Sequence, residues 1–299
     1  MAQQKRIRRL LRIMTNHTAG NLAAWEEAYK RWRNLTVQVA RPAEEPGPEH
    51  RRIIGLGKAA PAPVRDITEA ETTEWHNYTG FLSALGGVCV FASQSSAAGR
   101  NGFLAQQSAE SNYQALVEKF LSEMVDLLVC DSVYVREIVK ETLGADLSPR
   151  LYTILFQYLE TIVKKFFDST SGHALCTERH TLFVEQAISV LKLILDRVPE
   201  VSENLYAVDF GGLILSFANY LHRLTNGHVA LRIKVKMCQL TEALMAKKDY
   251  VTLRQEITMR NRLLEIITEW TSDYNAVSVN LDGHYGHWKI FLSSFPHPP

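Results

Sequence analysis

The feature of this sequence that most constrains its fold is the recurrence of apolar residues at helical spacing between about residues 112 and 270. Residues three or four positions apart share one face of an α-helix, so each such stripe predicts a helix with one buried face. The stripes are Leu151, Leu155, Tyr158, Ile162 and Phe166; Phe183, Ala187, Val190, Leu191, Ile194 and Val198; Val229, Ile233, Met237, Leu240 and Leu244; and Met259, Leu263, Ile266, Ile267 and Trp270.

The ends of these segments carry signals that agree with helices. Ser148 before Pro149 is typical of a helix start, and Gly144 after a helical run is typical of a C-terminal glycine cap. No strand-length run alternates apolar and polar residues. We therefore predict an all-α protein, an α-solenoid-like array of the HEAT or ARM type. Because no repeat of fixed period marks such an array, a compact helical bundle stays open as the competing architecture.

Composition divides the chain into four parts. Residues 1–40 form a basic N-terminal helical segment, with a helical pattern over its second half. Residues 41–65 are so rich in proline and glycine that they are predicted to be a linker. Residues 66–273 form the predicted helical scaffold, interrupted at 93–111 by a Ser-, Ala-, Gly- and Gln-rich segment that we expect to be a mobile loop. Residues 274–299 form a divergent C-terminal tail.

The N-terminal segment begins with a basic helical pattern. Five cations lie between Lys5 and Arg12, and no acidic residue occurs before Glu26. One interpretation is an amphipathic helix that touches anionic lipid or an acidic partner. The interpretation that we favour is a helix packed through its apolar face, with the basic residues in solvent. That apolar face consists of Ile7, Leu10, Leu11 and Met14.

Charge, cysteine spacing and hydropathy indicate the compartment. The formal net charge of +1 provides no overall field that would attract nucleic acid. The four cysteines are far apart and form no CxxC pair, which predicts free thiols in a reducing compartment. An apolar run at residues 78–92 is shorter than the roughly 20 residues that span a bilayer, and it predicts a buried helix. We expect a cytoplasmic protein without a transmembrane segment and leave peripheral membrane contact open.

Three groups of residues invite comparison with chemical sites. The glycines near Lys58 do not have the spacing of a phosphate-binding Walker loop, nor its Ser or Thr. His173, Cys176 and His180 are close in sequence, but a structural zinc site generally takes four ligands from two pairs. The adjacent acids at positions 26 and 27 would point apart on a helix. We therefore predict no catalytic residue, no metal ligand and no cofactor.

Six segments between residues 74 and 270 carry a resemblance to a known family. They are EWHNYTGFLSALGGVC at 74–89, LGADLSPRLYTILF at 143–156, KKFFDS at 164–169, FVEQAISVLKLILD at 183–196, KVKMCQLTEALMAKKD at 234–249 and LRQEITMRNRLLEIITEW at 253–270. In this order they resemble the region of neurofibromin and the fungal Ira proteins that lies upstream of the Ras-GAP domain. Collinear matches of this kind are more specific than any single motif.

The resemblance implies a piece of a large cytosolic negative regulator of Ras, in which helical arrays flank a central GAP domain. That domain acts through an arginine finger that stabilises the transferring phosphoryl group. The FLR-centred pattern of GAP domains does not occur here, and Arg254, Arg260 and Arg262 belong to an upstream helix. The resemblance therefore implies a non-catalytic fragment whose partners are the adjacent helical array and the GAP domain. It also allows self-association, and Ras would be contacted only indirectly.

Two other function classes stay open. One is a stand-alone helical adaptor whose protein partner is unrelated to Ras. The other is an enzyme on a helical scaffold, because catalytic partners that are distant in sequence leave no local motif. A downstream reading frame that encodes a GAP domain would separate the first class from the family interpretation. A deep pocket that holds several perturbed titratable groups would favour the second.

Overall fold

The computed structural model describes most of the chain, and the secondary structure of that part is helical throughout. An isolated β-bridge between Phe167 and Ala174 is the nearest approach to a strand in it. The predicted all-α fold is therefore confirmed. The described residues are 2–16, 18–41, 67–95, 104–167, 172–197, 205, 208–225, 227–247 and 256–275.

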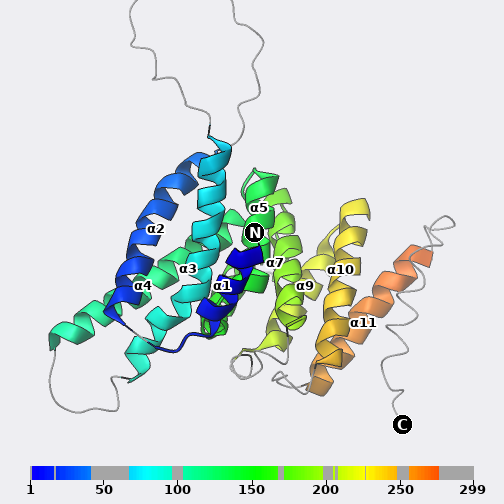
Figure 1. Cartoon of the computed structure of the whole chain (residues 1–299). Helices are drawn as coiled ribbons and strands as arrows, with labels where there is room; N and C mark the ends of the chain where they lie inside the picture. The colour runs from blue at the N-terminus through cyan, green and yellow to red at the C-terminus, as the bar shows by residue number, and fades with distance from the viewer. Residues whose placement is uncertain are drawn as a thin grey trace, which may run out of the picture.

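Ten α-helices account for nearly all of the described part, and they are labelled as in Figure 1. A π-helical turn, Thr142–Asp146, and a 3-10 turn, Pro149–Leu151, connect two of them. The helices are α1 (Ala2–Ile13), α2 (Ala19–Val39), α3 (Glu69–Ser95), α4 (Leu104–Leu127), α5 (Val133–Glu141), α6 (Tyr152–Lys164), α7 (Glu178–Leu195), α9 (Phe210–Arg223), α10 (Gly227–Ala246) and α11 (Glu256–Asn275).

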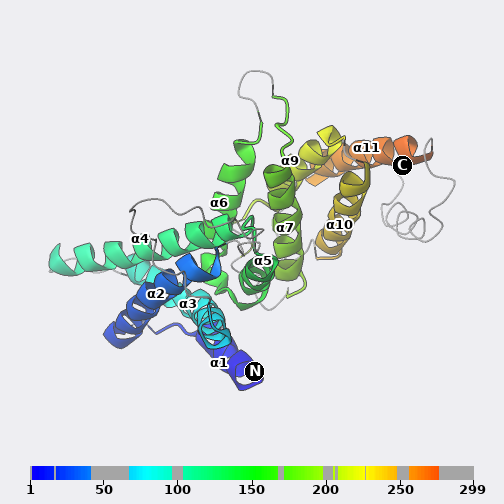
Figure 2. The ribbon, with the colours of Figure 1, turned by 90° about the horizontal axis from the view of Figure 1, so that it is seen from above.

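The helices stand side by side, from α2 and α3 at one end of the molecule to α10 and α11 at the other (Figures 1 and 2). Helices α4, α6, α9 and α11 pack on one another in succession. Helix α7 packs on both α5 and α10, and α9 packs on α10. At the other end α3 contacts α1, α2 and α4. Most helices are thus covered by neighbours on two sides.

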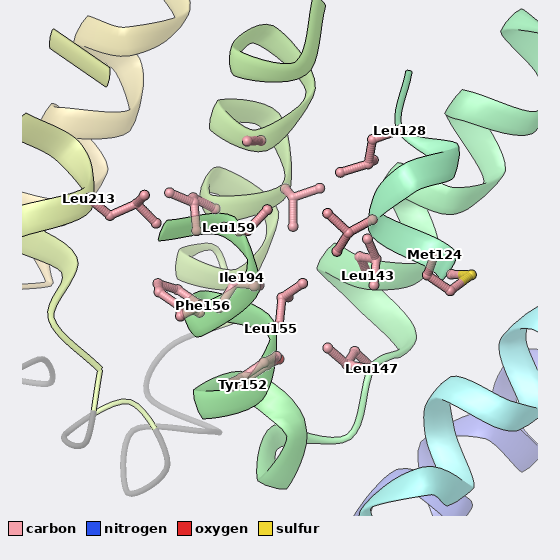
Figure 3. Packing of buried hydrophobic residues seen from close by; sticks show 14 of the residues in the cluster. Met124, Leu128, Leu143, Leu147, Tyr152, Leu155, Phe156, Leu159, Ile194 and Leu213 are labelled. Atoms are coloured by element: carbon pink, nitrogen blue, oxygen red, sulfur yellow. The ribbon is translucent and has the colours of Figure 1, made fainter. Parts of the chain in front are cut away.

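One hydrophobic core runs through this arrangement, from Trp25 of α2 to Trp270 of α11. Figure 3 shows its centre, where side chains of α4, α6, α7 and α9 meet. The predicted stripes of α7 and α11 are confirmed as buried faces. In α10 the stripe is buried from Ile233 to Leu244, whereas Val229 is partly exposed. Val198 lies outside the described residues.

The buried face of α6 differs from the predicted one. Tyr158 and Ile162 are only partly buried, while Phe156, Leu159 and Val163 are fully enclosed or nearly so. Helix α6 packs on α4 and on α9, so its contacts extend around the helix beyond one narrow stripe. A helix between two neighbours buries a wide face, and a stripe read from one row of positions captures only part of it.

Two predicted boundary signals have other roles in the structure. Gly144 does not cap a helix; it lies within the π-helical turn, where an added Cβ would come within 2.4 Å of the Leu193 Cβ. Close approach of α7 therefore explains this glycine. Ser148 does precede Pro149 at the start of the 3-10 turn, but its side chain makes no capping bond and donates to the Arg12 carbonyl instead.

The predicted bounds of the mobile loop, residues 93–111, are wrong. Helix α3 continues to Ser95 and α4 begins at Leu104, so at least half of the segment is helical. From Leu104 to Glu110 the sequence contains alanine, glutamine and leucine, which favour helices, and neither glycine nor proline. Positions 96–103, nearly all of the predicted linker and most of the tail lie outside the described residues.

The apolar run at 78–92 lies in α3, as predicted. Leu82, Leu85 and Val88 are buried there, between neighbouring helices. Gly86 faces Leu151 and Trp25, so small residues let α3 come close to the elements around it. Within the part of the chain that the structure describes, no helix combines the length and apolar character needed to cross a membrane.

Candidate functional site

The first unusual feature of the surface is helix α1, which is held in place by two buried arginines. The Arg12 Nε donates to the Leu147 carbonyl at 2.8 Å, and its Nη2 donates to the Tyr152 hydroxyl at 3.1 Å. The Arg8 Nη1 forms an ion pair with Asp146 at 2.9 Å. Paired and hydrogen-bonded in this way, guanidinium groups can be buried without an uncompensated charge.

The site that receives α1 explains why arginine is buried there. It presents the Leu147 carbonyl and the Asp146 carboxylate, two acceptors with which a leucine could not pair. The Arg8 Nη2 also approaches the His76 carbonyl of α3 at 3.4 Å. Gly80 on α3 makes room, because a Cβ there would lie 2.3 Å from the Arg8 guanidinium. Burial, together with the positive charge of Arg8, lowers the pKa of His76.

The predicted packing face of α1 is wrong at two of its four positions. Leu11 and Met14 are partly buried, but Ile7 and Leu10 face outward, at 49% and 64% exposure. Ile13 is 72% exposed on the same side. The helix thus turns two of its cations inward and three large apolar side chains outward, while Leu11 packs against the core. The four-residue spacing of Arg8 and Arg12, opposite the apolar stripe, is the sequence signal that could have revealed this orientation.

A second feature is an aromatic cluster that joins α2 to α3 and α4. Trp25, Tyr29 and Trp32 lie on one face of α2 and surround Phe120 of α4, with ring centroids 5.0–6.1 Å from it. The indole Nε1 of Trp25 donates to the Leu82 carbonyl at 3.0 Å. This hydrogen bond gives the buried indole N–H of Trp25 the acceptor that it requires. The cluster fixes the angle between three helices.

An open groove of about 530 Å³ lies beside this cluster, between α2 and α4. Its charged groups are engaged with one another: Lys30 pairs with Glu26, and Arg33 pairs with Glu123 of α4. Tyr29 donates to Glu123 at 3.0 Å, and burial and this carboxylate both raise the pKa of Tyr29. The groove is lined by Glu26, Tyr29, Lys30, Arg33, Asn34, Val37 and Leu116.

A third feature is the buried carboxylate of Glu185 on α7. It receives hydrogen bonds from Lys236 at 2.7 Å and Arg232 at 2.8 Å, both on α10. Burial alone would raise the pKa of Glu185, but the two cations outweigh it and lower the pKa. The carboxylate stays ionised and ties α7 to α10. This arrangement resembles a structural cross-link, because each charge has its partner within the protein.

The residues considered as metal ligands do not come together. His173 and Cys176 are exposed, whereas the His180 ring stacks on Phe166 with centroids 4.0 Å apart. The His180 Nδ1 lies 2.7 Å from the Leu175 carbonyl and so carries the proton that donates to it. Among the described residues, no three His, Cys, Asp or Glu side chains are grouped as metal ligands would be.

The other residues singled out in the sequence have ordinary roles or lie outside the described part. Glu26 and Glu27 pair with Lys30 and Arg31 of the next helical turn. Arg262 pairs with Glu265 on α11. Lys58 and Arg254 lie outside the described residues. The four cysteines are free, and burial raises the pKa of Cys89 and of Cys238 to about 12.

A scan against models of known protein families finds no match to this chain.

Proposed function

We propose that this chain is a non-catalytic helical scaffold of a neurofibromin-type Ras GTPase-activating protein, and that it positions a GAP domain of the same protein. The position of the resembling segments supports the proposal. Residues 74–89 lie in α3, 143–156 lead into α6, 183–196 cover most of α7, and 234–249 and 253–270 overlap α10 and α11. Each contributes buried residues to the single core. A shared fold would place family-like segments in core helices in this way.

The packing supports a scaffold role. The proposed solenoid would need helices that contact mainly their neighbours along the array, as α4, α6, α9 and α11 do. The aromatic cluster at one end and the Glu185 pairs near the other restrain the angles between helices. Because the angles between helices are restrained near both ends, the position of one end of the array determines the position of the other. The array could therefore hold a domain attached at one end in a defined place.

A second candidate is a stand-alone adaptor, and the groove between α2 and α4 favours it. Val37 lines this groove and is 62% exposed, so it offers an apolar contact beside ion-paired side chains. A groove of this kind fits an extended peptide or a helix better than a buried small molecule. The adaptor and the scaffold differ in whether a GAP domain belongs to the same protein.

We expect the purified chain not to accelerate GTP hydrolysis by Ras. Acceleration by GAP domains, ~10³–10⁵-fold, depends on a supplied arginine finger, and the scaffold proposal assigns that finger to another domain. Single-turnover hydrolysis by GTP-loaded Ras, with and without excess chain, measures this. A catalytic GAP domain added in a parallel reaction is the positive control. Saturable acceleration by the chain alone would overturn the non-catalytic proposal.

A further inference from the structure

Helix α1 presents an outward face on which apolar and basic side chains alternate around the helix. Ile7, Leu10 and Ile13 are exposed on this face. Arg6 and Arg9 are also exposed, and helical spacing places both on the same side of the helix as Leu10 and Ile13. Helix α1 contains no acidic residue to neutralise these cations. The outward face therefore combines positive charge with apolar side chains that water solvates poorly.

The inward face explains why this outward face stays available. Arg8 and Arg12 fasten the helix to Asp146, the Leu147 carbonyl and Tyr152. Leu11 packs against the core beside them, so attachment does not require the outward apolar side chains. Rotating α1 to bury Leu10 would remove both guanidinium groups from these acceptors and leave them unpaired. The apolar stripe is thus fixed in an outward orientation by polar contacts on the opposite side.

We propose that the outward face of α1, consisting of Arg6, Ile7, Arg9, Leu10 and Ile13, docks the protein onto an anionic phospholipid surface. Helix α1 lies at the outer edge of the molecule, beyond α3 (Figure 2), where a flat surface can reach it. Its apolar side chains would enter the boundary between headgroups and acyl chains, and its arginines would contact the lipid phosphates. The inference concerns this surface alone and does not depend on the proposed relation to Ras.

Charge favours lipid over a second copy of the chain. A symmetric pair of α1 helices would bring Arg6 and Arg9 against their own counterparts, and like charges across an interface repel. An anionic bilayer offers the opposite charge over a plane. Surfaces with a few apolar side chains and a few cations are typical of weak, reversible membrane association. Each of these side chains contributes a modest part of the affinity.

Vesicle co-sedimentation with the full chain tests the proposal. We expect binding to phosphatidylcholine vesicles that contain phosphatidylserine, little binding to phosphatidylcholine alone, and weaker binding at high salt. Arg6→Gln and Arg9→Gln should each lower the partition coefficient about fivefold. Leu10→Ser should lower it about tenfold, because it removes one inserted apolar side chain.

Matched variants on other surfaces serve as controls. Val37→Ser removes an apolar side chain that is 62% exposed on α2, and Arg223→Gln removes an exposed cation near the end of α9. Both should leave vesicle binding unchanged. All the α1 variants alter exposed side chains, so their circular dichroism melting curves should match that of the unaltered chain.

Three results would overturn the proposal. The first is failure of the unaltered chain to bind phosphatidylserine vesicles, which would leave an acidic protein surface as the better partner. The second is binding that the α1 substitutions do not weaken, since it would place the contact elsewhere. The third is a dimer in analytical ultracentrifugation that Leu10→Ser dissociates, because a second copy would then cover this face.

Discussion

Replacing Trp32 with alanine should lower the free energy of unfolding by about 3–5 kcal/mol, the range found for large aromatic side chains removed from a core. The Trp32 ring is fully buried and meets Phe120 edge-on, with centroids 5.0 Å apart. Its indole Nε1 donates to the Thr79 Oγ1 at 2.9 Å. The substitution removes this hydrogen bond and leaves a cavity where α2, α3 and α4 meet. Urea unfolding followed by circular dichroism measures the loss.

Two further variants identify which lost contact causes the destabilisation. Trp32→Phe keeps an aromatic ring and loses the indole N–H, so its cost should be smaller than that of the alanine variant. Val37→Ala lies on the same helix but alters an exposed side chain, so we expect a change within about 0.5 kcal/mol. Equal and small effects of Trp32→Ala and Val37→Ala would show that the aromatic cluster does not hold α2 to the rest of the protein.

Replacing Leu85 with alanine should lower the free energy of unfolding by about 2–5 kcal/mol, through lost transfer energy and a residual cavity. Leu85 is buried in the middle of α3, the helix that contacts α1, α2 and α4. The same substitution at Leu10, which is 64% exposed, provides the matched control. We expect that control to change stability by no more than about 0.5 kcal/mol in the absence of lipid.

The comparison of Leu85 with Leu10 also separates two membrane hypotheses. If the apolar run of α3 were a membrane anchor, the chain would float with neutral vesicles and Leu85→Ala would have little effect on unfolding in water. The packing of α3 predicts the reverse for both measurements. A small effect of Leu85→Ala, together with flotation on phosphatidylcholine vesicles, would contradict the burial of this helix.

Apolar spacing in the sequence identified buried positions correctly but did not identify every one of them. In α11 the apolar positions at helical spacing are the buried positions, because hydrophobic burial determines which face points inward. In α7 the predicted positions are buried as well, but contacts with both α5 and α10 also enclose Val184, Ile188 and Leu195. In α6 the same reasoning identified only part of the buried face. Contacts with both α4 and α9 decide which side chains of α6 are enclosed, and no local pattern specifies that there are two neighbours.

The candidate surface on α1 could not be predicted in the same way. Apolar periodicity assumes that leucine and isoleucine point inward, whereas this helix is attached through Arg8 and Arg12. Their shortest hydrogen bonds go to residues 146–152, more than 130 positions away, and only the folded chain brings these acceptors to α1. Gly144 is a similar case: its reason is the approach of Leu193, a contact that no local signal reports.

Full-length transcript sequencing across the codons after Trp270 tests the central claim most directly. The claim is that this chain is the helical scaffold upstream of a GAP domain. It predicts a message from the source organism in which the reading frame continues after Trp270 through further helices into a GAP domain that carries a finger arginine. Messages whose frame always closes within the residues that follow Trp270, at a locus with no GAP-encoding frame downstream, would contradict it.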